Sequence, residues 1–129
     1  MKPAIESFIT LAREDLAVAK LLMAAHPRHS AFHIEQAAEK LVKAVLTAED
    51  IRFPTSHHQL GALAALLPAD HPWRAELMAF DEFSSYATAS RYPTPGGWMP
   101  HEPDPADLRQ GWQEVANLID EIADWCAQP

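Results

Sequence analysis

Apolar residues recur every three or four positions through residues 31–46, which is the spacing of an α-helix. The apolar positions are Ile34, Ala38, Leu41 and Val45. Glutamate and lysine residues occupy other positions, as in a helix that buries one face against a protein core. Several alanines on the apolar stripe allow a neighbouring helix to approach closely. We therefore predict that this stretch is the central helix of the fold, with Ser30 as its N-cap.

A helix is also predicted before this central one. It begins near Pro3, because a proline in the first helical turn lacks only an N–H that would be unpaired there anyway. It ends before Pro27, because the residue preceding a proline is pushed away from helical geometry. The connection between the two helices is short, so they should pack antiparallel.

Three more helices are predicted in the second half of the chain. The first is short and ends at Pro68, the second has an apolar side that runs from Trp73 to Ala87, and the third begins with Pro105. The predicted N-cap residues are Thr55 or Ser56, then Asp70 or His71, and finally Asp104.

Prolines and a Gly-Gly pair concentrate in residues 91–105, so no regular element can run through this segment. A loop of this length in a compact domain is usually functional or mobile. No stretch has the pattern of a β-strand. The sequence therefore predicts an all-α fold in one domain, residues 1–129. The predicted architecture is an up-down antiparallel helical bundle of four main helices plus a short additional helix.

Composition narrows the class of protein. Hydrophobic residues make up 48% of the chain and charged residues 22%, so a folded domain is expected rather than a disordered chain. No apolar run is long enough to cross a membrane, and no secretory signal pattern is present, so we expect a cytoplasmic protein without membrane contact. The formal net charge of −8 disfavours non-specific binding to duplex nucleic acid.

The first candidate for chemistry is Arg52 with His57 and His58. Four residues separate the arginine from the first histidine and five from the second. An arginine can hold a phosphate while a histidine moves a proton, a pairing suited to metal-independent RNA cleavage. The alternative is ordinary loop polarity, with one histidine capping the short helix.

The second candidate is Arg91 with Tyr86 and Tyr92, at the entrance to the Pro/Gly-rich loop. An arginine can bind a phosphate, and tyrosines can stack on a base. The alternative is structural: the tyrosine would pack the end of the helix, and the arginine would pair with a carboxylate or with helix-end carbonyls.

The third candidate is the pair His29 and His33, one helical turn apart, a spacing that metal ligands can have. A metal site would still need a third ligand, for which His26 and His101 are the candidates, and exposed histidines are the alternative. The sequence contains no zinc-type cysteine cluster and no glycine-rich nucleotide motif. We therefore expect neither a metal nor a cofactor.

Three segments together resemble the HEPN domain family. They are Phe32–Ala44 with its Gln-Ala-Ala-Glu-Lys run, His58-Gln59-Leu60, and Ser90-Arg91-Tyr92-Pro93. The resemblance covers most of the chain. It implies an up-down helical bundle that commonly forms a homodimer with symmetric sites near the dimer cleft.

The resemblance also implies a functional setting. Many members are similar to partners of minimal nucleotidyltransferases, often in toxin–antitoxin pairs. Active members are metal-independent ribonucleases with four to six residues between an arginine and a histidine, and others are proposed to bind nucleotides or only to assist the partner. Arg91 matches the region of the family's catalytic arginine, but the corresponding downstream positions hold Gly96, Gly97 and Trp98.

The lack of a histidine at these downstream positions favours a HEPN protein that binds a nucleotide or RNA phosphate through Arg91, Tyr92 and His58. Such a protein would work with a nucleotidyltransferase. One alternative is a ribonuclease toxin, and another is a non-catalytic dimeric adaptor. Glu39 and Lys43 either line the cleft beside Arg91 or form a solvated salt bridge.

Overall fold

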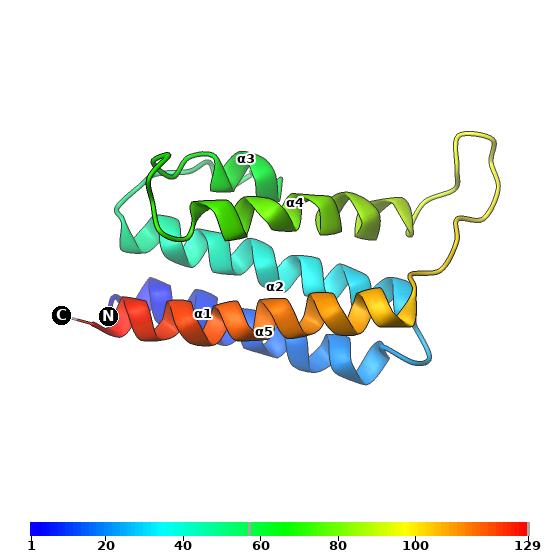
Figure 1. Cartoon of the computed structure of the whole chain (residues 1–129), viewed down its shortest axis with the longest axis horizontal. Coiled ribbons are helices and arrows are strands. Elements are labelled where there is room, and N and C mark those ends of the chain that lie inside the picture. The colour runs from blue at the N-terminus through cyan, green and yellow to red at the C-terminus, as the bar shows by residue number, and fades with distance from the viewer. Residues whose placement is uncertain (57, 129) are drawn as a thin grey trace.

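The computed structural model describes residues 1–56 and 58–128, and the fold is an all-helical bundle (Figure 1). Within the described residues the helices in chain order are α1 (Pro3–Leu22), α2 (Pro27–Ala48), α3 (Leu60–Ala64), α4 (Arg74–Ala89) and α5 (Pro105–Ala127). The described residues contain no strand. The predicted fold class is confirmed. None of these helices is long and apolar enough to cross a membrane.

Helix α2 lies at the centre, as predicted, and packs against all four other helices. Residues 23–26 join it to α1, and the two helices form an antiparallel hairpin (Figure 1). Helices α3 and α4 cover one side of α2, whereas α1 and α5 lie together on the other. Ile34, Leu41 and Leu46 are each at most 1% exposed, so α2 supplies much of the core.

Proline and aspartate define the helix starts that were predicted best. Pro3 stands in the first turn of α1, and Asp104 caps α5 by accepting a hydrogen bond from the backbone N–H of Ala106 at 2.8 Å. Pro105 follows directly in the first helical position. Residues 90–104 form the predicted irregular loop, and Arg28 donates a hydrogen bond to the carbonyl of Pro100 in this loop at 2.8 Å.

The other predicted N-caps are wrong. Helix α2 begins at Pro27, so Ser30 lies inside it, fully buried, and donates a hydrogen bond to the carbonyl of Ala19 in α1 at 2.7 Å. Helix α3 begins only after Gln59, which leaves Thr55 and Ser56 in the preceding turn.

Helix α4 follows Trp73, so neither Asp70 nor His71 occupies its N-cap. His71 instead accepts a hydrogen bond from the backbone N–H of Trp73 through Nδ1 at 3.2 Å. Pro72 belongs to the turn before the helix and not to its first turn. Local sequence therefore located these helices to within a few residues but not their first residue.

Candidate functional site

The candidate site begins with a buried polar stripe on α2. Glu35, Glu39 and Lys43 follow one another at intervals of four residues, so they lie on one face of the helix, and all three are buried. Lys43 donates a hydrogen bond to Glu39 across 2.9 Å. Our alternative of a solvated salt bridge is therefore wrong for this pair, because α4 and the segment before α3 cover this face of α2.

His58 covers the middle of the polar stripe. Its Nδ1 lies 2.7 Å from a carboxylate oxygen of Glu39 and 3.4 Å from the ammonium of Lys43. The short distance to the carboxylate favours the form of His58 in which Nδ1 carries a proton and donates it. The ring is 66% exposed, whereas the Glu39 side chain is 4% exposed. A buried carboxylate thus orients a histidine that remains accessible to solvent.

Arg91 lies beside the first residue of the stripe. It directly follows Ser90, the C-cap residue of α4, and its Nη1 is 3.5 Å from the Glu35 carboxylate. The guanidinium carbon is 4.6 Å from the ring centre of Phe32, so the cation stacks on an aromatic face. Nη1 is buried, and its contact with Glu35 is too long for a strong hydrogen bond. Of our two structural alternatives for this arginine, pairing with a carboxylate is the one observed.

Glu35 has an unusual protonation equilibrium. Burial raises its pKa above the ordinary value for a glutamate, because a charged carboxylate loses solvation inside the protein. The positive charge of Arg91 and a hydrogen bond from the Thr88 hydroxyl act in the opposite direction, and the charge of Glu39 adds to the increase. Functional sites often contain a carboxylate of raised pKa beside a specific cationic partner.

Glu35 and His58 both line a surface groove. It has a volume of about 520 Å³ and lies between α4 and the segment that leads into α3. Its lining residues are Glu35, His58, Gln59, Asp81, Ser84, Ser85, Thr88 and Ala89. Glu35 belongs both to the groove and to the ion pair with Arg91, so the structure brings the guanidinium and the histidine to one region although 32 positions separate them in sequence. The groove mixes hydroxyl, carboxylate and imidazole groups.

The two tyrosines of the second candidate separate in space. Tyr92 stays near Arg91, with its ring centre 5.8 Å from the guanidinium carbon, and the residue is 58% exposed. Tyr86 lines a different groove, between α4 and α5. Its hydroxyl accepts a hydrogen bond from the backbone N–H of Asp104 at 2.7 Å, so it fixes the start of α5. Tyr86 therefore does not join the Arg91 cluster.

The remaining candidates are dispersed. Arg52 is exposed in the connection between α2 and α3, and His57 lies outside the described residues. His33 is paired with Asp15 of α1 at 3.2 Å, and His29 is exposed. Among the residues that the structure describes, no group of three potential ligands is arranged to hold a metal ion.

Three contributors to the site were missed in the sequence. Glu35 had been seen only as a polar position of the central helix, and neither Phe32 nor Thr88 had been proposed as a site residue. A signal for Glu35 existed, because it continues the four-residue spacing of Glu39 and Lys43 next to the apolar stripe. For Phe32 and Thr88 there was no such signal, since both meet Arg91 or Glu35 only through the packing of α4 on α2.

Comparison with known proteins agrees with this architecture. The family model described as the HEPN domain matches residues 5–126. The chain belongs to the HEPN domain family. The resemblance of the three sequence segments to HEPN proteins is thereby confirmed.

A solved structure shows the same fold. The crystal structure of ST0689, an archaeal HEPN homologue, is similar to this HEPN chain with a TM-score of 0.56 at 22% sequence identity. The similarity covers 98% of this chain and 96% of that one. No curated protein matches the chain. The comparisons therefore establish the family and the fold.

Proposed function

We propose that this HEPN protein binds the phosphate of a nucleotide or of single-stranded RNA through Arg91. The observation that carries the proposal is the placement of the guanidinium, which lies over the Phe32 ring and near the exposed ring of Tyr92. Arginine binds phosphate through a planar fork of N–H donors, and stacking on an aromatic ring holds that fork in place. The protein would work in the cytoplasm as a homodimer.

The surroundings of Arg91 support a nucleotide ligand in particular. Tyr92 presents an exposed ring that can stack on a base. The hydroxyl of Ser84 and the imidazole of His58 offer further polar contacts along the groove. Glu35 competes with a phosphate for the arginine, and its raised pKa makes this competition weaker as the pH falls.

The test is fluorescence anisotropy with a labelled single-stranded RNA of about twelve nucleotides and with labelled ATP, at low salt because phosphate binding weakens with salt. Arg91→Ala should weaken binding about tenfold or more, as expected for a charge-assisted contact of about 1.5 kcal/mol or more. Arg109→Ala is the matched control, because Arg109 is an exposed arginine of α5. Equal affinity of both variants, each folded by circular dichroism, would reject the proposal.

A second candidate function is a metal-independent ribonuclease. The observation that favours it is the 2.7 Å contact between Glu39 and Nδ1 of His58, because a carboxylate that orients a histidine leaves Nε2 to accept a proton. His58 would activate a ribose 2′-hydroxyl, and Arg91 would stabilise the charge that develops on the phosphate. Cleavage of RNA in EDTA that both His58→Ala and Arg91→Ala abolish would favour this function over binding alone.

We further propose that the partner is a minimal nucleotidyltransferase, in a toxin–antitoxin-like pair. The family membership supports this pairing. Co-expression with the product of a neighbouring nucleotidyltransferase gene, followed by size-exclusion chromatography with light scattering, tests both the complex and the homodimer. If a complex forms while neither RNA nor nucleotide binds, the protein is a dimeric adaptor.

A further inference from the structure

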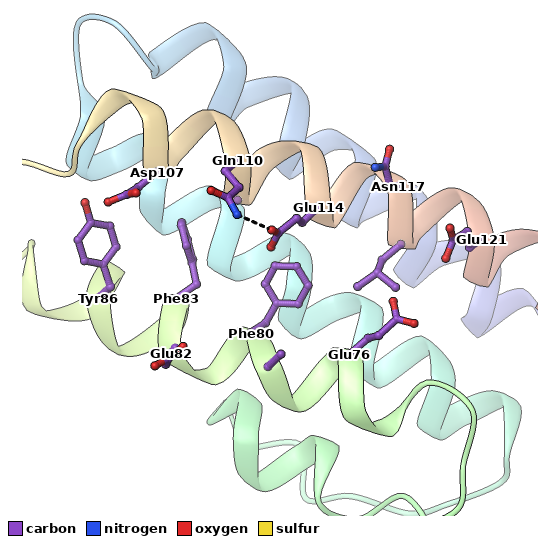
Figure 2. Close-up of a pocket in the computed structure, with 13 residues that line it drawn as sticks. Glu76, Phe80, Glu82, Phe83, Tyr86, Asp107, Gln110, Glu114, Asn117 and Glu121 are labelled. Atoms are coloured by element: carbon purple, nitrogen blue, oxygen red, sulfur yellow. Dashed lines mark hydrogen bonds between the residues drawn. The ribbon is translucent and has the colours of Figure 1, made fainter.

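A second groove lies on the opposite side of α4 from the candidate site. It has a volume of about 640 Å³ and runs between α4 and α5 (Figure 2). Both helices pack on α2, but their backbones are too far apart to pack closely against each other. Phe80 and Phe83 of α4 point towards α5 in Figure 2. Gly111 permits this approach, because a Cβ atom there would lie 2.7 Å from the Phe83 ring.

The rim of this groove carries charge of one sign. Its ionised side chains are Glu76, Glu82, Asp107, Glu114 and Glu121, all of them exposed, and no lysine or arginine lines the groove. Figure 2 shows these carboxylates spread along both helices rather than gathered at one point. An extended row of this kind attracts an elongated cationic partner more than a single ion.

The length of the groove indicates the size of that partner. Along α4 it extends from Glu76 to Tyr86, about 15 Å at 1.5 Å per residue, and along α5 from Asp107 to Glu121, about 21 Å. An α-helix of ten to fourteen residues, about three to four turns, has the same length. Side chains at positions i, i+3 or i+4, and i+7 of such a helix would face the phenylalanines.

A second copy of this chain does not supply a suitable helix. The chain has a net charge of −8, and a copy would present the same acidic rim. In α2, the helix richest in lysine, Lys40 pairs with Asp15 and Lys43 with Glu39. Among the described helices, α1, α4 and α5 each contain more acidic than basic residues. The partner must therefore be another protein.

We propose that the α4–α5 groove binds a basic amphipathic helix of a partner protein. The apolar side chains of that helix would lie on Phe80, Phe83 and Leu118, and its lysines or arginines would pair with the glutamates of the rim. The proposal is independent of phosphate binding at Arg91, because it uses the other face of α4 and none of the residues of the Arg91 site.

The test uses a synthetic helix of about sixteen residues with leucine at helical spacing and lysine elsewhere, measured by fluorescence anisotropy against the full chain. A scrambled peptide of the same composition keeps the charge but has no apolar face. The amphipathic peptide should bind at least about tenfold more tightly than the scrambled one. Equal affinity would overturn the proposal, because it would reduce the interaction to general charge attraction.

Two groove variants locate the binding. Glu114→Gln/Glu121→Gln should weaken binding about three- to tenfold through the loss of two exposed ion pairs, whereas Glu6→Gln/Glu14→Gln on α1 should leave it unchanged. Asn117→Trp places a bulky ring in the groove at an exposed position and should block the peptide.

If both glutamine pairs weaken binding equally, or if Asn117→Trp binds normally while folded, the peptide does not occupy this groove. If Asn117→Trp instead dissociates a dimer of the chain, as judged by light scattering, a second copy occupies the groove and the proposal is wrong. Binding of RNA or ATP should not change in any groove variant, which separates this proposal from the function of Arg91.

Discussion

Removal of Arg91 should destabilise the protein through the carboxylate that it leaves behind. The side chains of Arg91 and Glu35 are 20% and 11% exposed and lie 3.5 Å apart. Removing one partner of a buried ion pair costs about 3–5 kcal/mol. Because this pair is partly exposed and Glu35 can take up a proton, the ion-pair loss falls just below that range, at about 2–2.5 kcal/mol. Loss of stacking on Phe32 adds about 0.5–1 kcal/mol.

For Arg91→Ala we therefore expect a loss of about 3 kcal/mol in the free energy of unfolding at neutral pH. With a urea dependence of about 2 kcal/mol per molar, the unfolding midpoint would fall by about 1.5 M. The double variant Arg91→Ala/Glu35→Gln should recover about 1–2 kcal/mol, since no unpaired charge then remains. Urea titrations followed by circular dichroism measure all the members of this double-mutant cycle.

The pH dependence has a definite sign. Burial raises the pKa of Glu35 in the folded protein above its value in the unfolded chain. Protonation of Glu35 therefore stabilises the fold fully below the unfolded pKa, and this stabilisation is lost as the pH rises through the folded pKa. Without Arg91 the pKa rises further, so the deficit of Arg91→Ala should be smaller at about pH 5 than at about pH 7.5. A deficit that does not vary with pH, or that Glu35→Gln fails to relieve, would refute the buried-carboxylate argument.

Three further substitutions test the packing, each by urea unfolding. Leu41→Ala in the core should lower the free energy of unfolding by about 2–5 kcal/mol. Leu21→Ala, at a leucine that is 83% exposed, should change it by about 0.5 kcal/mol or less. Similar losses in the two variants would contradict the assignment of the core. Asp104→Ala should cost about 1 kcal/mol through loss of the α5 cap, whereas Asp104→Asn should retain most of it. Ser30→Ala should cost about 1 kcal/mol, because the hydrogen bond to Ala19 is buried; an unchanged midpoint would show that this bond contributes nothing.

The sequence was sufficient for the fold because the helices carry strong local signals. The apolar period of residues 31–46, the proline at position 3 and the Asp104-Pro105 pair each specify geometry within a few residues of chain. Helix starts that lack such a local signal were predicted at the wrong residues, and Ser30 shows why. A serine can cap a helix or bond to a neighbouring helix, and only the approach of α1 decides between the two.

The candidate site was predicted less completely because it is built from tertiary contacts. Arg91 and His58 were named from sequence, but their carboxylate partners lie on α2, far from both along the chain. Burial of Glu39 and Lys43 depends on α4 and on the segment before α3 covering them, which no periodicity of α2 alone reveals. Tyr86 was grouped with Arg91 through sequence proximity, whereas the helical twist directs it to the other side of α4.

The position of α5 has a consequence for the order of folding. Helices α1 and α2 meet across four intervening residues, so their hairpin closes at little entropic cost. Helix α5 packs on the same two helices, but more than fifty residues lie between its start and the end of α2, so its docking must close a far longer loop. We expect the α1–α2 hairpin to form early and α5 to dock late. Folding kinetics would then give high φ-values at Leu16 and low ones at Ile119, and the reverse pattern would contradict this order.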